Sequence, residues 1–560
     1  MLRPPAYDAA RAARLLDGLL YGVDIGFSGA ERFTRSREAN NAATTAPEHV
    51  ASLIDSMIEA EVAQGFKKGP FLDPPFTLFW VSPLGAVPKP GSAKIRLIHN
   101  LSHPFGGDSV NANIPREEYI MQRFADAIAA IRRFGRGALL LKFDVSAAFK
   151  RIPVRPEDRP LLGMRWRGKY YYELVLPFGL RTSGYRWEEY AAALHYFFEQ
   201  HLGVHLVVHY VDDFLLIVPP SPNAATLATA QRAAVESLCQ RLGVPLAEEK
   251  TVGPVTEILF LGIVIDTLSM EYRLSEERVC RLRDQLADLG NGKPLTCDTL
   301  MSLVGKLEFA ALVIPAGATF LRRIRSQMLR IKHSRNSGGG QQAHRLNMEA
   351  RLDAEWWLHV FLTSEGNRRQ ILEPPWTTAA AMHIYSDACD TGYGAFYGSH
   401  WLQGTWSAAL LEFAKVHKRI SMPFLELYAL TQAAVTWGAL WRGQRITFYC
   451  DAQASVAAVR IMRSRRDSMS LLLRLLFATA ARHGFEFRCV WLEGKTNEIA
   501  DRLSRGCDAQ ELRALLPNAD TQATRCTPLE LEKEPWVPWE DPVSEEHRLQ
   551  QRKATFAPPL

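Results

Sequence analysis

Two adjacent acids, Asp212 and Asp213, interrupt the apolar run HYVDDFLLIV at residues 209–218. An unpaired carboxylate is costly to bury, and two neighbouring carboxylates also repel each other. The stretch supplies no basic partner, so the pair of acids predicts a cation at this position. An ordinary alternative is a two-residue hairpin turn between HLVVHYV and FLLIV, because Asp is a favourable turn residue. The two interpretations are compatible, since an acidic hairpin tip can also bind a metal ion.

A third acid, Asp144, ends a second apolar stretch, ALLLKFD. The ordinary alternative for such an acid is a cap on the helix that follows. If the two stretches are neighbouring strands of one sheet, however, Asp144 lies close to Asp212 and Asp213. Three carboxylates in one place suit nucleotidyl transfer, in which two divalent cations activate the attacking oxygen and stabilise the leaving one.

A triphosphate substrate would also require basic residues opposite such cations. The segment VPKPGSAKIRLIHNLS contains Lys89, Lys94 and Arg96 in a predicted β-hairpin with Pro and Gly at its tip. Standing alone, this segment would be interpreted as an ordinary solvated hairpin.

A second group of acids lies in the C-terminal part of the chain. Asp387 and Asp451 end two predicted strands, Glu426 lies early in a long predicted helix, and Asp501 lies in the last helix. Strand-end acids of an open α/β sheet lie where such sheets bind ligands. The ordinary alternatives are a solvated helix face for Glu426 and a surface ion pair for Asp501.

The elements that position these acids follow from hydrophobic periodicity. Residues 47–66 are predicted to be helical, and mixed α and β structure continues to about residue 265. Helical periodicity then extends to the segment SRNSGGGQQ, which is typical of a flexible surface loop or linker. From residue 379 onward, three strands, a helix, a strand, two helices, a strand and a last helix predict a mixed sheet of five strands.

Composition indicates a globular protein of several domains. The 560 residues are 47% hydrophobic, and a net charge of +6 does not by itself predict nucleic-acid binding. The eight cysteines include no C-x-x-C pair, which argues against a zinc or redox motif. We expect no signal peptide and no membrane span, and we therefore expect an intracellular protein of the cytoplasm, the nucleus or both.

Six segments, in chain order, resemble the fingers and palm of retroelement reverse transcriptases. They are SPLGAVPKPGSAKIRLIHNLS, LLLKFDVSAAFKRIPV, LPFGLRTSGYRW, YVDDFLLIV, LAEEKT and ILFLGIVID. The resemblance implies an α+β right-hand polymerase with fingers, palm and thumb, which copies RNA into DNA from dNTPs with Mg²⁺, or with Mn²⁺ as a substitute. It makes Asp144 and Asp212 the principal catalytic ligands of both metal ions and Asp213 the peripheral third acid.

The same resemblance implies roles in binding the incoming nucleotide. Lys89 and Arg96 would hold the triphosphate, a role for which the fork of the Arg guanidinium is suited. Phe149 would stack under the sugar and collide with a 2′-hydroxyl, which favours deoxynucleotides. The ordinary alternative for Phe149 is a core residue on a short helix.

Three further segments receive roles from the resemblance. Phe178 and Gly179 of LPFG would line the nucleotide pocket and the template, and FLG at residues 260–262 would position the primer end. Lys250 would protonate the departing pyrophosphate. A plain core strand and a solvated lysine are the ordinary alternatives for FLG and Lys250.

The C-terminal region resembles an α/β ribonuclease H-like domain. Asp387, Glu426, Asp451 and Asp501 match the D-E-D-D set of that family, which implies that they hold two Mg²⁺ ions for cutting RNA in an RNA–DNA hybrid. The sequence departs from many members of the family, because the loop VWLEGKTNEIAD lacks their catalytic His. We therefore expect a working but slower hydrolase.

Predicted boundaries follow from these resemblances. They are an N-terminal helical extension at 1–78, fingers and palm at 79–265, a helical thumb at 266–335, a linker or connection at 336–378, the ribonuclease H-like domain at 379–510, and a charged, disordered tail at 511–560.

The segments LVGKLEFAALVIPAGATFLRRI, LELYAL and NEIADRLSR are most similar to DIRS-type retrotransposons, relatives of the gypsy-like group, in which a tyrosine recombinase performs integration. The resemblance implies an RNA template, a DNA primer, an RNA–DNA hybrid and dNTPs as partners, with other retroelement proteins such as a recombinase as further candidates. Two other functions stay open. One is a decayed or host-retained nucleic-acid-binding protein, and the other is a ribonuclease H whose palm only binds the hybrid. The completeness of both acid sets argues against decay.

Overall fold

The structure is a computed structural model that describes residues 8–29, 36–38, 47–88, 95–336, 342–362, 367–371, 382–408, 410, 421–464, 466–520 and 522–529. The chain divides into two compact units. One unit comprises Met1–Tyr272 with Gln370–Leu372, and the other comprises Arg273–Arg369 with Glu373–Leu560. The boundary between the two units therefore falls within β14 (Glu271–Leu274). The last residue of β15 (Arg368–Gln370) belongs to the first unit again.

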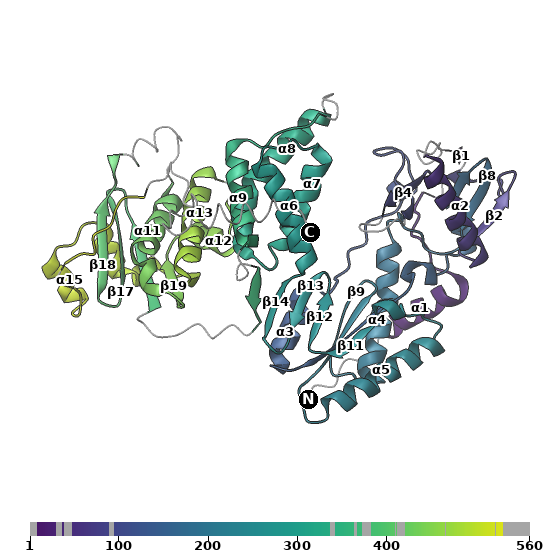
Figure 1. The fold of residues 1–560 in the computed structure, drawn as a ribbon, viewed down its shortest axis with the longest axis horizontal. Coiled ribbons are helices and arrows are strands. Elements are labelled where there is room, and N and C mark those ends of the chain that lie inside the picture. The colour runs from purple at the N-terminus through teal and green to yellow at the C-terminus, as the bar shows by residue number, and fades with distance from the viewer. Residues whose placement is uncertain are drawn as a thin grey trace, which may run out of the picture. The chain divides into compact units, whose positions relative to one another are not determined.

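The first unit begins with a five-stranded sheet and the helices beside it (Figure 1). The strands, in spatial order, are β1 (Arg37–Glu38), β3 (Trp80–Val81), β7 (Gly163–Trp166), β8 (Lys169–Glu173) and β2 (Lys67–Phe71). Helix α2 (Glu48–Ala63) buries Ala51, Ile54 and Ile58, whose spacing of three to four residues places them on one face. The first helix, α1 (Ala9–Tyr21), precedes this sheet, and β4 (Leu84–Pro88) pairs with β5 (Ile95–His99) in a separate hairpin.

A second, four-stranded sheet forms the centre of the first unit. Its strands, in spatial order, are β11 (Val252–Val255), β6 (Leu139–Asp144), β10 (Asp213–Val218) and β9 (Val207–Tyr210). All residues of β10 after Asp213 are at most 1% exposed, so both faces of this strand are covered. The main helices of this region are α3 (Phe124–Phe134), α4 (Ser183–Gln200) and α5 (Ala224–Arg241), and the hairpin of β12 (Glu257–Phe260) and β13 (Ile263–Asp266) follows. Its core includes Leu141, Phe143, Trp187 and Phe214.

The second unit starts with helices that pack on one another. They are α6 (Glu276–Gly290), α7 (Cys297–Ala310), α8 (Arg322–Asn336) and α9 (Met348–Leu362), with the short helix η7 (Pro315–Leu321) between α7 and α8. Phe320 of η7 stacks on Trp356 of α9, with ring centroids 4.1 Å apart. Asp353 of α9 is fully buried and forms an ion pair with Arg474.

The predicted mixed sheet of five strands is present in the second unit. The spatial order is β18 (His400–Thr405), β17 (Gly392–Tyr397), β16 (His383–Ala388), β19 (Arg445–Cys450) and β20 (Glu486–Trp491). The first three strands are antiparallel neighbours, whereas β16, β19 and β20 are parallel. The helices of this region are α11 (Met422–Trp437), α12 (Gln453–Arg460), α13 (Asp467–His483), α14 (Glu498–Ser504) and α15 (Ala509–Leu515). Helix α11 packs against β16, β17 and α13, and the residues from Phe424 to Ala434 are all buried.

The structure differs from the sequence-based expectation at both ends of the chain. The N-terminal segment, which we expected to be helical, also contributes β1 and β2, because Lys67–Phe71 pairs with β8. The expected tail begins within α15, and Leu529 donates its backbone N–H to the Tyr428 hydroxyl at 3.1 Å. This contact holds the start of the tail against α11. Residues from 530 onward, and most of the expected linker SRNSGGGQQ, lie outside the described residues.

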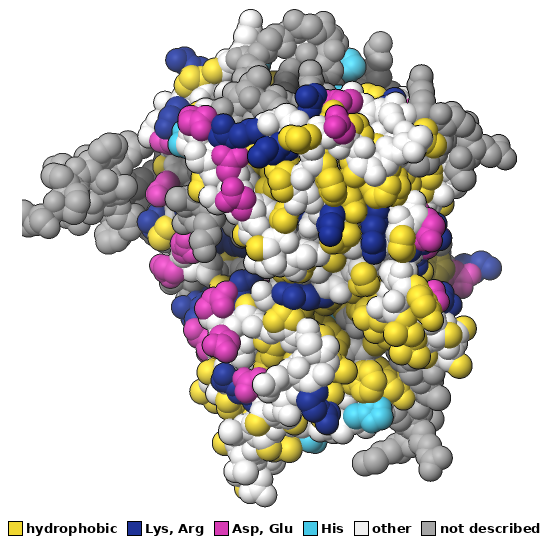
Figure 2. All heavy atoms as spheres, turned by 90° about the vertical axis from the view of Figure 1, so that its right-hand side faces the viewer, with side chains coloured by type: hydrophobic (Ala, Val, Ile, Leu, Met, Phe, Trp, Pro, Cys, Tyr) yellow, Lys and Arg dark blue, Asp and Glu magenta, His cyan; other side chains and the backbone are white. Residues whose placement is uncertain are grey.

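The charges of the chain are mixed on the face that Figure 2 shows. Lys and Arg side chains lie among apolar and acidic side chains there, without a continuous basic surface. This distribution agrees with the small net charge of +6. In the described part of the chain, every helix is too short or too polar to cross a membrane.

Candidate functional sites

The first site lies where β6 and β10 meet, in the first unit. Asp213 pairs directly with Asp144 across these antiparallel strands, so the predicted convergence of the two acid segments is present. Asp212 precedes Asp213 in the turn from β9, and its carbonyl accepts the Val145 N–H at 2.9 Å. The register of one sheet therefore brings Asp144 close to two adjacent acids that follow it by about 70 residues in the chain.

The hairpin turn lies one residue earlier than predicted. Tyr210 pairs with Asp213, which leaves Val211 and Asp212 as the two connecting residues. Val211 has φ 56°, a backbone conformation that is costly for a β-branched residue. The Trp187 indole donates to the Val211 carbonyl at 2.7 Å and so helps to hold this strained turn.

The three acids carry more negative charge than their surroundings neutralise. Burial, followed by the charges of Asp212 and Asp144, raises the pKa of Asp213 to about 6. Burial also raises the pKa of Asp212, and the charge of Asp144 adds to this shift. Lys250 places its Nζ 2.9 and 3.0 Å from the two carboxylate oxygens of Asp144. Lys142 and Arg96 also act on these acids, but burial and mutual repulsion still raise the pKa values of Asp212 and Asp213, so the site favours additional positive charge.

Several predicted nucleotide-binding residues gather beside these acids. Phe149 lies on the short helix η4 (Ala148–Arg151), and its ring centroid is 5.2 Å from that of Phe178. The Arg96 guanidinium lies over the Phe178 ring, 5.4 Å from its centroid. Lys89, at the tip of the β4–β5 hairpin, lies outside the described residues. The structure thus places Arg96, Phe149 and Phe178 in one group.

Gly179 occupies a position that only glycine can fill. Its φ is 111°, and a Cβ atom there would lie 2.0 Å from the carbonyl oxygen of His99. The buried Asn111 holds the same loop, because its Nδ2 donates to the Gly179 carbonyl at 2.8 Å and its Oδ1 accepts the Arg181 N–H at 2.8 Å. Our sequence reasoning missed Asn111, because SVNANI shows no pattern that distinguishes it from an ordinary loop asparagine.

The segment FLG forms a tight turn rather than a plain core strand. Phe260 ends β12 and is fully buried, whereas Leu261 and Gly262 connect β12 to β13 with φ 48° and 79°. Lys142 of β6 donates to the Leu259 carbonyl at 3.1 Å, which ties this turn to the central sheet. A role of FLG at the primer end stays a prediction.

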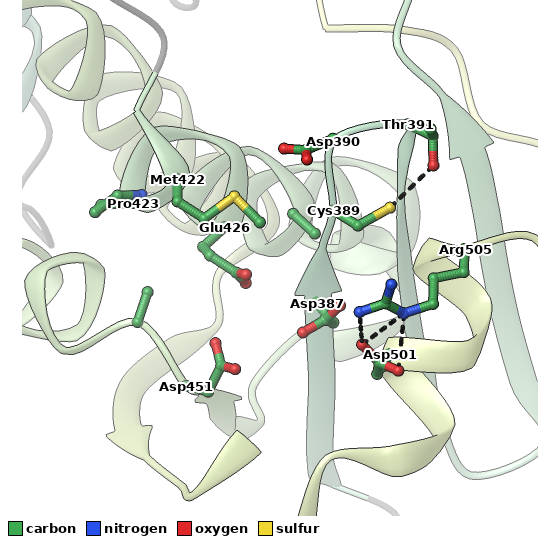
Figure 3. A pocket seen from close by; sticks show the side chains of 12 residues that line it. Asp387, Cys389, Asp390, Thr391, Met422, Pro423, Glu426, Asp451, Asp501 and Arg505 are labelled. Carbon is green, nitrogen blue, oxygen red and sulfur yellow. Dashed lines mark hydrogen bonds and ion pairs between the residues drawn. The ribbon is translucent and has the colours of Figure 1, made fainter. Parts of the chain in front are cut away.

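The second site is a pocket of about 640 Å³ in the second unit, in which all four acids of the second predicted set meet (Figure 3). Asp387 lies near the end of β16, and Asp451 comes directly after β19. Because these two strands are parallel neighbours, both acids lie at the same edge of the sheet. Glu426 enters the pocket from α11 and Asp501 from α14. The ordinary alternative for Glu426, a solvated helix face, is therefore wrong, because Glu426 is buried. Asp501 lines the pocket and also forms a surface ion pair with Arg505, so its ordinary alternative is present as well.

Burial and mutual repulsion dominate the electrostatics of this pocket. Glu426 is only 3% exposed, and burial, followed by the charges of Asp387 and Asp451, raises its pKa to about 9. Burial, with Asp451 and Asp501 as weaker causes, raises the pKa of Asp387 to about 6. Among the described residues, Glu426, Asp451 and Cys450 offer possible ligand atoms that all lie within 4.8 Å of one another. Hard carboxylate oxygens with raised pKa values suit a divalent cation.

Two residues that follow Asp501 contact acids of the pocket: Ser504, the last residue of α14, and Arg505, directly after it. Ser504 donates to Asp387 at 2.7 Å, and Arg505 places its Nε 3.0 Å from both carboxylate oxygens of Asp501. Our sequence reasoning missed both residues. Their spacing of three and four residues from Asp501 on one helix was the available signal. None of the described residues that line the pocket is a histidine, in agreement with the loop sequence.

Two backbone contacts set the position of the strand-end acids. The buried Asn497 side chain donates to the Ser386 carbonyl at 3.0 Å, one residue before Asp387. The Trp491 indole donates to the Asp451 carbonyl at 2.8 Å. Both donors come from the loop and strand that precede α14, so this segment fixes the strand ends from one side.

A family comparison agrees with the first site. Residues 87–265 match the sequence model of the family described as "Reverse transcriptase (RNA-dependent DNA polymerase)". No curated protein sequence matches the chain. A foamy virus protease–reverse transcriptase solved with double-stranded DNA is 14% identical, with 85% of this chain and 73% of that chain covered and a TM-score of 0.45. The foamy virus protein solved with an RNA/DNA hybrid is 15% identical, with 82% and 55% covered and a TM-score of 0.47. The match of residues 87–265, which include Asp144, Asp212 and Asp213, shows that the chain contains a reverse transcriptase domain.

Proposed function

We propose that this protein is an RNA-directed DNA polymerase that also cuts the RNA strand of an RNA–DNA hybrid at a second site. The observation that carries the polymerase proposal is the direct pairing of Asp213 with Asp144 inside the reverse transcriptase domain. The grouping of Arg96, Phe149 and Phe178 in the same domain supports it. The meeting of four acids in one pocket supports the second activity.

In the polymerase site, Asp144 and Asp212 would hold two divalent cations, Mg²⁺ or Mn²⁺, with Asp213 at the periphery. Bound there, the cations would activate the primer 3′-oxygen and stabilise the leaving pyrophosphate. Lys250 pairs with Asp144 in the structure, and its ammonium group would be released from that carboxylate if a cation were bound there. Its ammonium group is then free to give a proton to the pyrophosphate.

The residues beside the acids select and hold the nucleotide. Arg96, together with Lys89, binds the triphosphate. Phe149 packs under the sugar and excludes a 2′-hydroxyl, so the polymerase prefers dNTPs. Phe178 and Gly179 line the nucleotide site, and the close approach of Gly179 to the His99 carbonyl leaves no room for a side chain there.

In the second site, Asp387, Glu426, Asp451 and Asp501 would hold divalent cations, which supply an activated water for hydrolysis of the RNA strand. Arg505, which is paired with Asp501, lines the pocket and offers a guanidinium group that can contact a phosphate of the hybrid. Without a loop imidazole, proton transfer depends on water, and we expect slow turnover.

The proposed substrates are an RNA template, a DNA primer, dNTPs and the RNA–DNA hybrid that the polymerase makes. The similarity of its linking segments to DIRS-type elements supports an origin in such a retrotransposon. The two activities would act in sequence: the polymerase copies RNA into DNA, and the ribonuclease then removes the copied RNA before the second DNA strand is made.

The direct test is incorporation of dTTP on poly(rA)/oligo(dT) with Mg²⁺ or Mn²⁺, beside cleavage of a labelled RNA–DNA hybrid. We expect both reactions from the wild-type protein and neither in the presence of EDTA. Absence of incorporation by well-folded protein would overturn the polymerase proposal, and absence of cleavage would overturn the ribonuclease proposal.

We also predict that Mg²⁺ stabilises the protein more at high pH than at low pH. The raised pKa values of Asp213, Asp387 and Glu426 mean that the native state binds these protons more tightly than the unfolded chain. This contribution to stability is complete below the unfolded pKa values of about 4 and is lost as the pH rises through the folded values. Mg²⁺ can replace the lost protons, so its effect should grow over this range.

Thermal unfolding with Mg²⁺ and with EDTA measures this effect. The rise in Tm on adding Mg²⁺ should be larger at about pH 8 than at about pH 5. K⁺ at matched ionic strength is the control. An equal rise at both pH values would contradict the prediction.

A further inference from the structure

A buried ionic cluster lies next to the nucleotide-binding residues of the first site. It consists of Glu61, Lys67, His99, Lys150 and Glu173. All of these side chains except Glu61 are at most 7% exposed, and Glu61 is 20% exposed. The family resemblance assigned no role to any of them, and in the sequence they look like ordinary surface residues.

Each charge in the cluster has a partner of opposite sign. Lys67 stands directly opposite Glu173 on the paired strands β2 and β8, forms an ion pair with it, and lies 3.0 Å from Glu61. Lys150 reaches the other oxygen of Glu173 at 3.3 Å and Glu61 at 3.5 Å. The Nε2 atom of His99 lies 3.0 Å from the carbonyl of Gly163.

Glu173 and Lys150 stay charged around neutral pH. Burial alone would raise the pKa of Glu173, but Lys150 and Lys67 outweigh it and lower that pKa to about 2. Burial would lower the pKa of Lys150, but the charges of Glu173 and Glu61 raise it above its usual value. Burial lowers the pKa of His99 to about 4, so this imidazole is neutral. An ionised Glu173 and an ionised Lys150 therefore lie together in an interior region.

Such a cluster adds little to the stability of the fold. The desolvation of buried ions offsets most of their attraction, and apolar side chains of similar volume often stabilise a fold equally well. What a buried ion pair does provide is a defined geometry, because a misplaced partner leaves an uncompensated charge.

Three members of the cluster are close neighbours of predicted nucleotide-binding residues. Lys150 directly follows Phe149 on η4, and adjacent side chains of a 3₁₀ helix point about 120° apart. Glu173 ends β8, from which the chain leads into the loop that carries Phe178. The His99 N–H donates to the Phe178 carbonyl at 3.0 Å. An inward Lys150 therefore fixes the rotation of η4 that turns Phe149 towards Phe178.

We propose that Lys150 is a positioning residue for sugar selection: its ion pair with Glu173 orients η4 so that the Phe149 ring meets the sugar of the incoming nucleotide. This inference rests on the proposed polymerase function. Loss of the ammonium group frees η4 to rotate, and the Phe149 ring then covers the 2′ position less completely.

The test compares dGTP with GTP on poly(rC)/oligo(dG), because the two nucleotides differ only at the 2′ position. For Lys150→Met we expect a higher KM for dGTP and a fall of about tenfold or more in the preference for dGTP over GTP, since small displacements of positioning groups have large kinetic effects. Lys150→Arg keeps the charge and should retain most of the preference. Phe149→Ala shows how far the preference for dGTP falls when the aromatic ring is absent.

Lys67→Met is the matched control. It removes the other buried ammonium group of the cluster but leaves the pair of Lys150 with Glu173 in place. It should lower Tm in a similar way while keeping the preference for dGTP, and this difference separates positioning from a merely structural role. If Lys150→Met does not fold, Lys150→Gln, which keeps a polar end in the buried site, carries the same expectation.

Two results would overturn the inference while the polymerase function stands. One is a folded Lys150 variant with the wild-type preference, and the other is an equal loss of preference in Lys67→Met. If the wild-type protein incorporates no nucleotide at all, the proposed function itself fails and the inference falls with it.

Discussion

Asp212→Asn is expected to abolish nucleotide incorporation and to leave hybrid cleavage intact. The change keeps the size of the side chain but removes the charge that would hold a cation beside Asp144. Mutation of residues that merely support metal ligands already costs about 10–100-fold, so loss of a direct ligand should cost at least about 10³-fold. The measurement is incorporation on poly(rA)/oligo(dT), with cleavage of a labelled hybrid measured on the same preparation.

The fold should tolerate this substitution. Asp212 lies in the turn between β9 and β10, and its carbonyl contact with the Val145 N–H does not involve the side chain. Asn also removes the charge whose burial, with the repulsion of Asp144 as a weaker cause, raises the pKa of Asp212 in the native state. Loss of incorporation should therefore occur without a fall in Tm.

Glu249→Gln is the matched control for Asp212→Asn. Glu249 is an exposed acid on the short helix η6 (Glu248–Lys250), next to Lys250, and it is not one of the three paired acids. This variant should incorporate nucleotides like the wild type. Comparable incorporation by Asp212→Asn and Glu249→Gln would exclude Asp212 as a metal ligand.

The second large effect is expected for Asp387→Asn, which should abolish hybrid cleavage and leave incorporation intact. Asp387 lies at the centre of the acidic pocket, between Asp451, Asp501 and the Ser504 hydroxyl. Asn keeps an oxygen that can accept the Ser504 hydrogen bond but removes the negative charge. We expect a loss in the same range, at least about 10³-fold, because a direct ligand is again removed.

This variant should also be more stable than the wild type when divalent cations are absent. Burial raises the pKa of Asp387 to about 6, so the ionised side chain destabilises the native state above that pH. A neutral Asn removes this effect. In EDTA at about pH 8, Tm should therefore rise, which separates loss of activity from loss of folding.

Asp390→Asn is the control from the same pocket. Asp390 also lines the pocket, but its side chain is exposed and it does not belong to the set of four acids (Figure 3). We expect near-normal cleavage from this variant. If Asp390→Asn and Asp387→Asn lose cleavage equally, the assignment of the four acids is wrong. If Asp387→Asn also stops incorporation, the two sites do not act independently.

The types and order of residues, with the family resemblances that they carry, indicated which acids lie together in each group, and their roles as metal ligands stay predictions. Asp144, Asp212 and Asp213 stand out because a carboxylate at the end of an apolar strand is costly without a cation. The alternation of strands and helices after residue 379 predicted the mixed sheet of five strands, because these elements are long and have clear periodicity. Such local signals need no knowledge of which segments meet in space.

The tertiary structure alone decided which charges are buried. Glu426 could equally have been a solvated helix residue, and only the packing of α11 against β16 and β17 encloses it and raises its pKa. The turn of Val211 and Asp212 depends on the register of β9 with β10, which shifted the predicted turn by one residue.

The buried ionic cluster is the clearest example of a feature that the sequence did not reveal. Lys67, Lys150 and Glu173 are residue types that usually lie on the surface, and no spacing in the sequence connects them. They meet because β2 pairs with β8 and because Lys150 of η4 reaches Glu173 at the end of β8. Desolvation depends on contacts between distant segments, whereas the sequence shows only the residue types that those contacts will enclose.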